Sequence, residues 1–234
     1  MQKQTIILLK AVTHILCLLP LLSLYRFYSS GALALNSDPI NFITHFTGNW
    51  ALWILLASLA ITPIRRISVR ISWLIRFRRL IGLYAFFYAT LHLATYLFLF
   101  SGYDVVAVLD GLRAGHPAVI FEQFRQVWPY IWDDVMKRRF VQVGFLAWLI
   151  LLALAATSPA AIMRAMGGKN WQRLHRFVYL AAAAAVIHYW WLVKTGVLSP
   201  WKDTAILAVL LLARVGYVLL KKRSVSTTKV VAAR

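Results

Sequence analysis

Hydrophobic residues occur along the chain in six long runs, and most charged residues lie in the connections between them. Each run is close to the roughly 20 residues that a helix needs to cross a hydrocarbon core about 30 Å thick. The runs cover residues 6–27, 46–64, 80–100, 141–158, 174–193 and 204–220. A helix satisfies its own backbone hydrogen bonds in lipid. The pattern therefore predicts an all-α fold, a polytopic membrane bundle of six transmembrane helices.

The composition agrees with this interpretation. The chain is 61% hydrophobic and only 14% charged, and its mean hydropathy is +0.69. It has 26 Lys and Arg against 7 Asp and Glu. A soluble protein with this excess would be a candidate for binding nucleic acid, but here the basic residues mark the connections between spans. The single cysteine, Cys17, excludes an intrachain disulfide and a cysteine cluster for zinc or iron–sulfur.

The basic connections predict how the helices are oriented. The connection between the second and third spans, RRISVRISWLIRFRR, has six arginines and no acid, and the tail is also purely basic. The positive-inside rule places both in the cytoplasm. Both termini are then cytoplasmic, spans three and five run in the same direction, and residues 1–223 form the membrane domain, followed by a basic cytoplasmic tail at 224–234. All acidic residues fall in the outer connections: Asp38, Asp104, Asp110, Glu122, Asp133, Asp134 and Asp203.

Two segments allow more than one interpretation. The first span resembles a cleavable signal that ends at Ala32-Leu33-Ala34, but Lys10 and the length of the apolar run favour retention. The outer connection at 101–139 mixes aromatic and charged residues. We expect a solvated loop with Trp128 and Trp132 in the interfacial belt. The alternatives are an amphipathic helix on the outer membrane surface and a docking segment for a partner.

Two histidines inside spans three and five are the candidate chemistry. His92 follows Arg79 by 13 residues and His188 follows His175 by the same interval, which is about 20 Å along a helix. In parallel spans this puts His92 and His188 in the outer half of the membrane, and Arg79 and His175 near the inner face. Neutral imidazoles suit iron, copper or zinc, and two opposed histidines without carboxylates suit a haem best.

Other roles for these histidines remain open. His92 and His188 can instead be hydrogen-bond partners packed between helices, and His175 can be a solvated residue at the membrane edge. Thirteen residues turn a helix by about 1300°, so an ideal helix does not place His175 and His188 on one stripe. The remaining histidines are expected to be packing, interfacial or surface residues: His14, His45 and His116. No internal repeat is apparent.

Four segments together resemble a known family. They are HFTGNWAL (45–52), ITPIRR (61–66), RRLIGLYAFFYATLHLATY (78–96) and WQRLHRFVYLAAAAAVIHYWW (171–191). They are similar to the MsrQ (YedZ) family of haem-binding membrane subunits, within the ferric reductase-like transmembrane superfamily. Superfamily relatives carry two histidines on each of two helices, for two b haems. This chain retains His92, His175 and His188 and has Arg79 at the fourth position.

The resemblance implies an electron-transfer subunit in the bacterial inner membrane. It implies haem b between His92 and His188 and leaves open a second inner haem on His175, with Arg79 suited to a haem propionate. Family members are also associated with FMN. They pass electrons from the quinol pool or a cytosolic flavin reductase to MsrP, a periplasmic molybdopterin enzyme that reduces methionine sulfoxide in oxidised proteins. The chain would be an oxidoreductase component whose sulfoxide chemistry occurs on that partner.

Two other functions are compatible with the bare sequence. A proton-coupled transporter can use an intramembrane histidine as a relay, but it is expected to have broken helices at matched positions, whereas we expect spans three and five to be uninterrupted. A non-redox scaffold would use the histidines for packing. The chain has no G-x-G-x-x-G fingerprint in a strand–turn–helix setting, so any NAD(P)H chemistry belongs to a partner.

Overall fold

The structure, a computed structural model, describes residues 3–193 and 199–232, and these residues form helices and no strand. The helices are α1 (Lys3–Ser29), α2 (Pro39–Ile64), α3 (Ile75–Thr95), α4 (Val105–Arg113), α5 (Val119–Lys137), α6 (Arg139–Ala156), α7 (Ala160–Met166), α8 (Gly168–Leu174), α9 (Val178–Leu192) and α10 (Ser199–Ala232). Three short turns are η1 (Val69–Leu74) and η3 (His175–Phe177), which are 3-10, and η2 (Tyr96–Phe100), which is π-helical. The predicted all-α polytopic bundle is confirmed.

Five stretches of the described residues are long and apolar enough to cross a membrane: Gln4–Ser29, Pro39–Ile64, Val69–Phe100, Arg139–Ala156 and Pro200–Leu220. The expected fifth span, 174–193, is helical but not uninterrupted, because η3 separates α8 from α9. At the junction the Trp171 carbonyl accepts from the His175 backbone N–H and also from His175 Nδ1, which lies 3.2 Å away. The count of six crossings stays a prediction.

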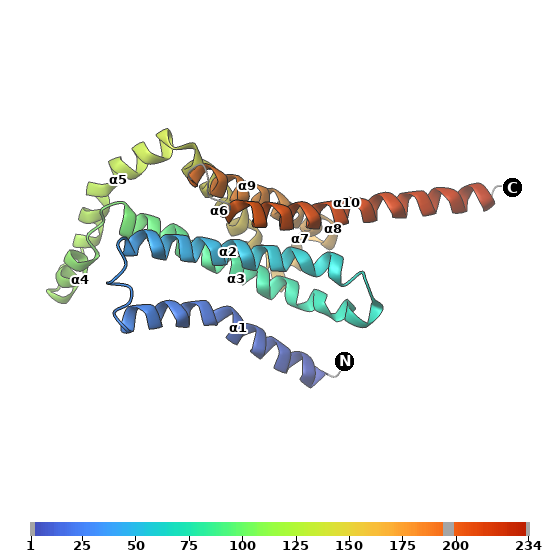
Figure 1. The fold of residues 1–234 in the computed structure, drawn as a ribbon, viewed down its shortest axis with the longest axis horizontal. Helices are drawn as coiled ribbons and strands as arrows, with labels where there is room; N and C mark the ends of the chain where they lie inside the picture. The colour runs from blue at the N-terminus through green and yellow to red at the C-terminus, as the bar shows by residue number, and fades with distance from the viewer. Residues whose placement is uncertain (1–2, 194–198, 233–234) are drawn as a thin grey trace.

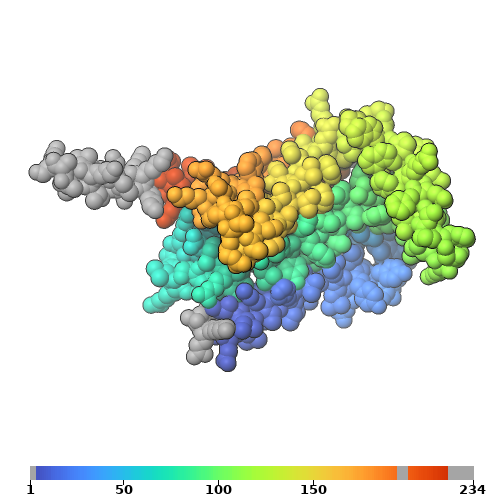
Figure 2. All heavy atoms as spheres, turned by 180° about the vertical axis from the view of Figure 1, so that it is seen from behind, coloured from blue at the N-terminus to red at the C-terminus, as the bar shows by residue number. Residues whose placement is uncertain are grey.

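The helices form two pairs that meet at the centre of the bundle. Helix α2 packs along α3, and α6 packs along α9, while α3 also contacts α6. Helix α10 lies against α2 and α9, and α1 lies against α3. Helices α4 and α5 extend across one end of the bundle, and α1 begins and α10 ends at the opposite end (Figures 1 and 2). The start of α1 and the end of α10 therefore lie at the same end of the bundle, and the cytoplasmic location of that end stays a prediction.

The centre of the bundle is close-packed, and its outer surface is apolar. Tyr88 and Ala85 on α3 and Ala181 and Ala182 on α9 are completely buried. The small alanines let the helix backbones approach closely, as is usual between membrane helices. The Tyr88 hydroxyl donates to the Cys17 carbonyl at 2.7 Å, which ties α3 to α1. Many large apolar side chains face outwards, as a lipid-exposed surface requires.

Polar residues define where the outer helices begin. The Asp38 carboxylate accepts from the Asn41 backbone N–H at 3.0 Å and caps α2. The Asp104 carboxylate caps α4 in the same way, through the Ala107 N–H at 2.9 Å. Each cap satisfies a backbone donor that has no partner within its helix. Helix α2 therefore starts at a defined point and carries Thr44 and Gly48 to the depth of the site described next.

Candidate cofactor site

His92 on α3 and His188 on α9 face each other across the centre of the bundle. Their ring centres are 6.0 Å apart and the ring planes are inclined by 77°. Imidazole nitrogen binds a transition metal at about 2 Å, so two nitrogens on opposite sides of one ion are about 4 Å apart. Ring centres lie farther apart than the nitrogens, by about one ring width. The observed separation therefore fits one metal ion held between the two rings.

The outer nitrogen of each ring is bonded to a neighbouring helix. His92 Nδ1 lies 2.9 Å from the Thr44 carbonyl of α2, and His188 Nδ1 lies 2.6 Å from the Phe140 carbonyl of α6. A carbonyl oxygen can only accept, so each Nδ1 must carry the proton. Neutral imidazole then presents a free Nε2 lone pair, which is the arrangement found in metal-ligating histidines. Packing histidines do not require this arrangement on both rings.

Two glycines make room for these rings. A Cβ added to Gly144 of α6 would lie 2.6 Å from His188 Nδ1, and one added to Gly48 of α2 would lie 3.0 Å from His92 Nδ1. Both distances are shorter than ordinary van der Waals contact. Each histidine ring therefore lies directly on the backbone of the neighbouring helix, one turn beyond the carbonyl that it bonds.

In both halves of the site, the carbonyl and the glycine lie at the same sequence distance from their histidine. The sequence alone did not lead us to this equivalence. Thr44 precedes His92 by 48 residues and Phe140 precedes His188 by 48 residues. Gly48 and Gly144 stand in the same relation to their histidines. The pair α2–α3 and the pair α6–α9 thus build equivalent halves of the site. The equivalence lies in the spacing and not in similar residues, so it is not a sequence repeat.

The rings border a cavity of about 440 Å³. This volume lies within the range of small-molecule and cofactor sites. Most of its wall is aliphatic or aromatic, with polar groups from Asn41, His45, Asn49 and Arg138. Two opposed neutral imidazoles in an apolar cavity that also contains an arginine match a haem, which has an iron, a flat apolar ring and anionic propionates. Among the described residues no cluster of three or more His, Cys, Asp or Glu could hold a metal ion. The residues present therefore fit a haem better than a carboxylate metal site.

Helix α5 closes one side of this cavity. Its residues Phe124, Trp128 and Trp132 belong to the cavity wall, and successive ring centres are 5.5 and 6.1 Å apart. The expectation of a solvated loop at 101–139 was wrong, because α4 and α5 occupy most of the segment. The alternative of a helix is confirmed, and its position on the membrane surface stays a prediction. One face of α5 covers the cavity because its aromatic residues recur at four-residue intervals, which places them on one helix face.

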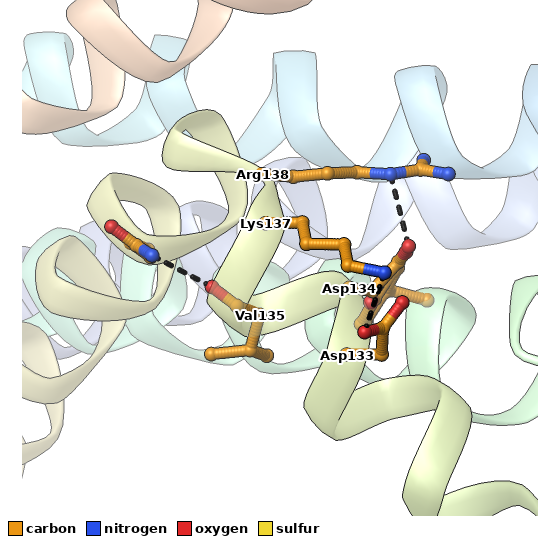
Figure 3. A network of polar contacts seen from close by, with 7 residues as sticks. Asp133, Asp134, Val135, Lys137 and Arg138 are labelled. Carbon is orange, nitrogen blue, oxygen red and sulfur yellow. Dashed lines mark hydrogen bonds and ion pairs between the residues drawn. The ribbon is translucent and has the colours of Figure 1, made fainter.

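A polar network holds the end of α5 against the bundle. Arg138 Nε donates to Asp134 Oδ1 at 2.9 Å, and the Tyr96 hydroxyl donates to Asp134 Oδ2 at 3.0 Å. Figure 3 shows the Arg138–Asp134 pair beside the neighbouring pair of Lys137 and Asp133. Because only Nε of Arg138 is used in this network, its terminal nitrogens are left to interact with a carboxylate in the cavity.

Arg79 and His175 are not part of this cavity. The His175 ring is stacked on Trp171, with ring centres 3.8 Å apart, and Arg79 is exposed. Neither residue belongs to the wall of the cavity. The structure thus brings His92 and His188 together and leaves the predicted inner pair separate from them, as the rise of about 20 Å over 13 helical residues predicts.

The other histidines have three different environments. His14 Nδ1 lies 2.7 Å from the Tyr84 hydroxyl, a packing contact between α1 and α3. His116 is exposed in the connection between α4 and α5. His45 was expected to be a packing or interfacial residue, but it belongs to the cavity wall. In the sequence, the only indication that His45 lines the cavity is that it directly follows Thr44.

Known proteins resemble this chain over nearly its whole length. Residues 47–186 match the family described as ferric reductase like transmembrane component, a match that includes His92 and stops two residues before His188. The protein-methionine-sulfoxide reductase heme-binding subunit MsrQ of Xanthomonas oryzae pv. oryzae is 41% identical over 229 residues, 96% of this chain and 92% of the relative. The subunit of the same name from Herminiimonas arsenicoxydans is 42% identical over 210 residues, 89% of this chain and 84% of the relative. No solved structure matches.

Proposed function

The chain belongs to the ferric reductase-like transmembrane family and, within it, to the MsrQ haem-binding subunits, and we propose that it is an electron-transfer subunit holding haem b between His92 and His188. The observation that carries the proposal is the pair of opposed rings, each with its Nδ1 proton donated to a backbone carbonyl. The family relationship supports haem as the cofactor, and the geometry of the two rings supports His92 and His188 as its ligands.

The chain's own residues would hold and insulate the cofactor. His92 and His188 would bind from opposite sides, with their orientation fixed by the Thr44 and Phe140 carbonyls. The aromatic and aliphatic cavity wall would exclude water, and solvent exposure is one of the factors that set the reduction potential of a bound cofactor. Bound haem would supply a one-electron carrier. Ligation by two imidazoles leaves no open position for oxygen, which suits electron transfer.

The proposed partner is a periplasmic MsrP-like molybdopterin reductase that repairs methionine sulfoxide in periplasmic proteins. The proposed donor is the quinol pool or a cytosolic flavin reductase, and the proposed location is the bacterial inner membrane. Support comes from the name of the relatives and from α5. This helix forms a cavity wall at the end of the bundle that the basic connections place outside. An electron leaving the cavity on that side would pass the aromatic rings of α5.

A second cofactor near the inner face belongs to the same proposal. His175 would ligate an inner haem, with Arg79 paired to a propionate, or the two would contribute to a flavin or quinone site. Family association with FMN supports the flavin. Trp171 covers one face of the His175 ring and the Trp171 carbonyl accepts from its Nδ1, so the in-plane Nε2 would be the ligating atom.

Absorption spectra of purified variants test the principal site. His92→Ala and His188→Ala should each remove the haem Soret band and the sharp α band of the reduced protein, while the protein still inserts, because the apolar spans are unchanged. His116→Ala is the matched control, since His116 is an exposed histidine, and it should retain full haem content. Wild-type haem content in either of the first two variants would disprove the ligand assignment.

A further inference from the structure

A group of arginines without acidic partners lies at the opposite end of the bundle from α5. Arg65 and Arg66 follow α2, Arg78 lies in the first turn of α3, and Arg214 lies on α10. Arg65 and Arg214 are both like-charged neighbours of Arg78, whose side chain faces Tyr179 of α9. Three segments of the chain thus bring positive charge to one place.

Aromatic rings hold two of these guanidinium groups without neutralising them. The Arg66 guanidinium carbon lies 3.8 Å from the ring centre of Tyr217, and that of Arg214 lies 4.4 Å from the ring centre of Tyr179. Such cation–π contacts orient an arginine and leave its N–H donors available. All seven acids of the sequence lie elsewhere, and the three ion pairs found among the described residues are all in the α4–α5 region.

Two buried polar atoms beside this group have no hydrogen-bond partner in the described part of the chain. They are Thr62 Oγ1 and Arg65 Nε. Thr62 also borders a small cavity together with Arg66, Tyr179 and Arg214. A buried donor without a partner is destabilising, and so are like charges held together near lipid. An anion at the mouth of this cavity would relieve both.

We propose that Arg65, Arg66, Arg78 and Arg214 form a binding site for a phosphate group at the predicted cytoplasmic end of the bundle. Arginine forks match phosphate oxygens with paired hydrogen bonds, and the Thr62 hydroxyl adds one further donor. The phosphate belongs either to an anionic phospholipid of the inner leaflet or to a soluble phosphate-bearing cofactor of the flavin mononucleotide class. The site is separate from the His92–His188 cavity and does not depend on a haem there.

Binding measurements on the full chain distinguish the two sources. Protein in phosphatidylcholine nanodiscs is titrated with FMN and with riboflavin, which lacks the phosphate. In parallel, the thermal unfolding midpoint is compared in nanodiscs with and without about 30% phosphatidylglycerol. A cofactor phosphate predicts that FMN binds at least about tenfold more tightly than riboflavin. A lipid phosphate predicts a higher midpoint with phosphatidylglycerol.

Variants decide whether these arginines are responsible. The double variant Arg65→Gln/Arg214→Gln should weaken FMN binding about tenfold or more, or remove the phosphatidylglycerol effect. Arg214→Lys keeps the charge without the fork and should give an intermediate result. Arg70→Gln, at an exposed arginine of η1, should behave as wild type. A normal His92–His188 haem spectrum in each variant confirms folding.

If neither FMN nor phosphatidylglycerol gives a response that depends on Arg65 and Arg214, the phosphate site is disproved. The cofactor alternative rests on the inner flavin site of the proposed function. Absence of haem from the wild-type protein would count against the His92–His188 haem site and not against the phosphate site, because the two measurements use different ligands at different ends of the bundle.

Discussion

Replacing Gly144 by alanine tests whether the close packing of His188 on α6 matters for the cofactor. The new Cβ would lie 2.6 Å from His188 Nδ1 and 2.8 Å from Cε1, whereas ordinary contact begins at 3.4 Å. The ring must therefore move by about 0.8 Å. This movement would strain or weaken the hydrogen bond from His188 Nδ1 to the Phe140 carbonyl, which is 2.6 Å long. Losing such a supporting bond typically costs roughly 10–100-fold in metal affinity.

Gly144→Ala should lower haem affinity although helix propensity alone would make the substitution stabilising. Alanine is better than glycine inside a helix by up to about 1 kcal/mol, so Gly144→Ala should not unfold α6. We expect full insertion with haem affinity lowered roughly 10–100-fold and a changed reduced spectrum. Gly48→Ala should have the same effect to a smaller degree, since its contact with His92 is 3.0 Å.

Haem titration of the apoprotein measures both variants, with Gly216→Ala as control because no atom lies within 4 Å of its added Cβ. The reasoning is refuted if Gly144→Ala binds haem with wild-type affinity and spectrum. It is also refuted if Gly216→Ala loses haem to the same extent.

Three further predictions concern the rest of the molecule. His175→Ala should spare the haem spectrum of the outer site, because the His175 ring packs on Trp171 away from the cavity, and Arg79→His should raise the occupancy of any inner haem. Haem-to-protein ratios and low-temperature spectra measure both effects. Unchanged ratios and electron transfer in both variants would exclude an inner haem. Arg138→Gln should weaken haem retention about tenfold, because a charge-assisted bond to a carboxylate is lost; equal rates of haem loss to apomyoglobin would contradict it. A reporter fused after Arg234, which lies outside the described residues, should be active only in the cytoplasm, and periplasmic activity would overturn the proposed orientation.

Most of the fold follows from the sequence because lipid restricts what an apolar run can do. Twenty apolar residues in hydrocarbon must form a helix, since no water is present to bond an open backbone. The positions of the spans are therefore close to the observed helices. The exception is at His175, where a 3-10 turn separates α8 from α9. The apolar run contains no signal for that turn.

The depth of His92 and His188 could also be predicted, because residue number and helical rise determine it. Which way each ring points could not. That depends on the rotation of each helix about its axis, which the packing of α2 on α3 and of α6 on α9 decides. The role of Arg138 and the α5 rings was hidden for a related reason. A sequence of mixed aromatic and charged residues is equally typical of a surface helix and of a cavity wall.

The sequence by itself determined the helices and the two histidines at equal depth. Only the tertiary structure decided that the rings face each other at 6.0 Å, that Thr44 and Phe140 fix their protons, and that Gly48 and Gly144 make room for them. The physical reason is range. Helix formation depends on neighbours within a few residues, whereas each of these hydrogen bonds joins residues 48 positions apart, and such contacts exist only after the helices have packed.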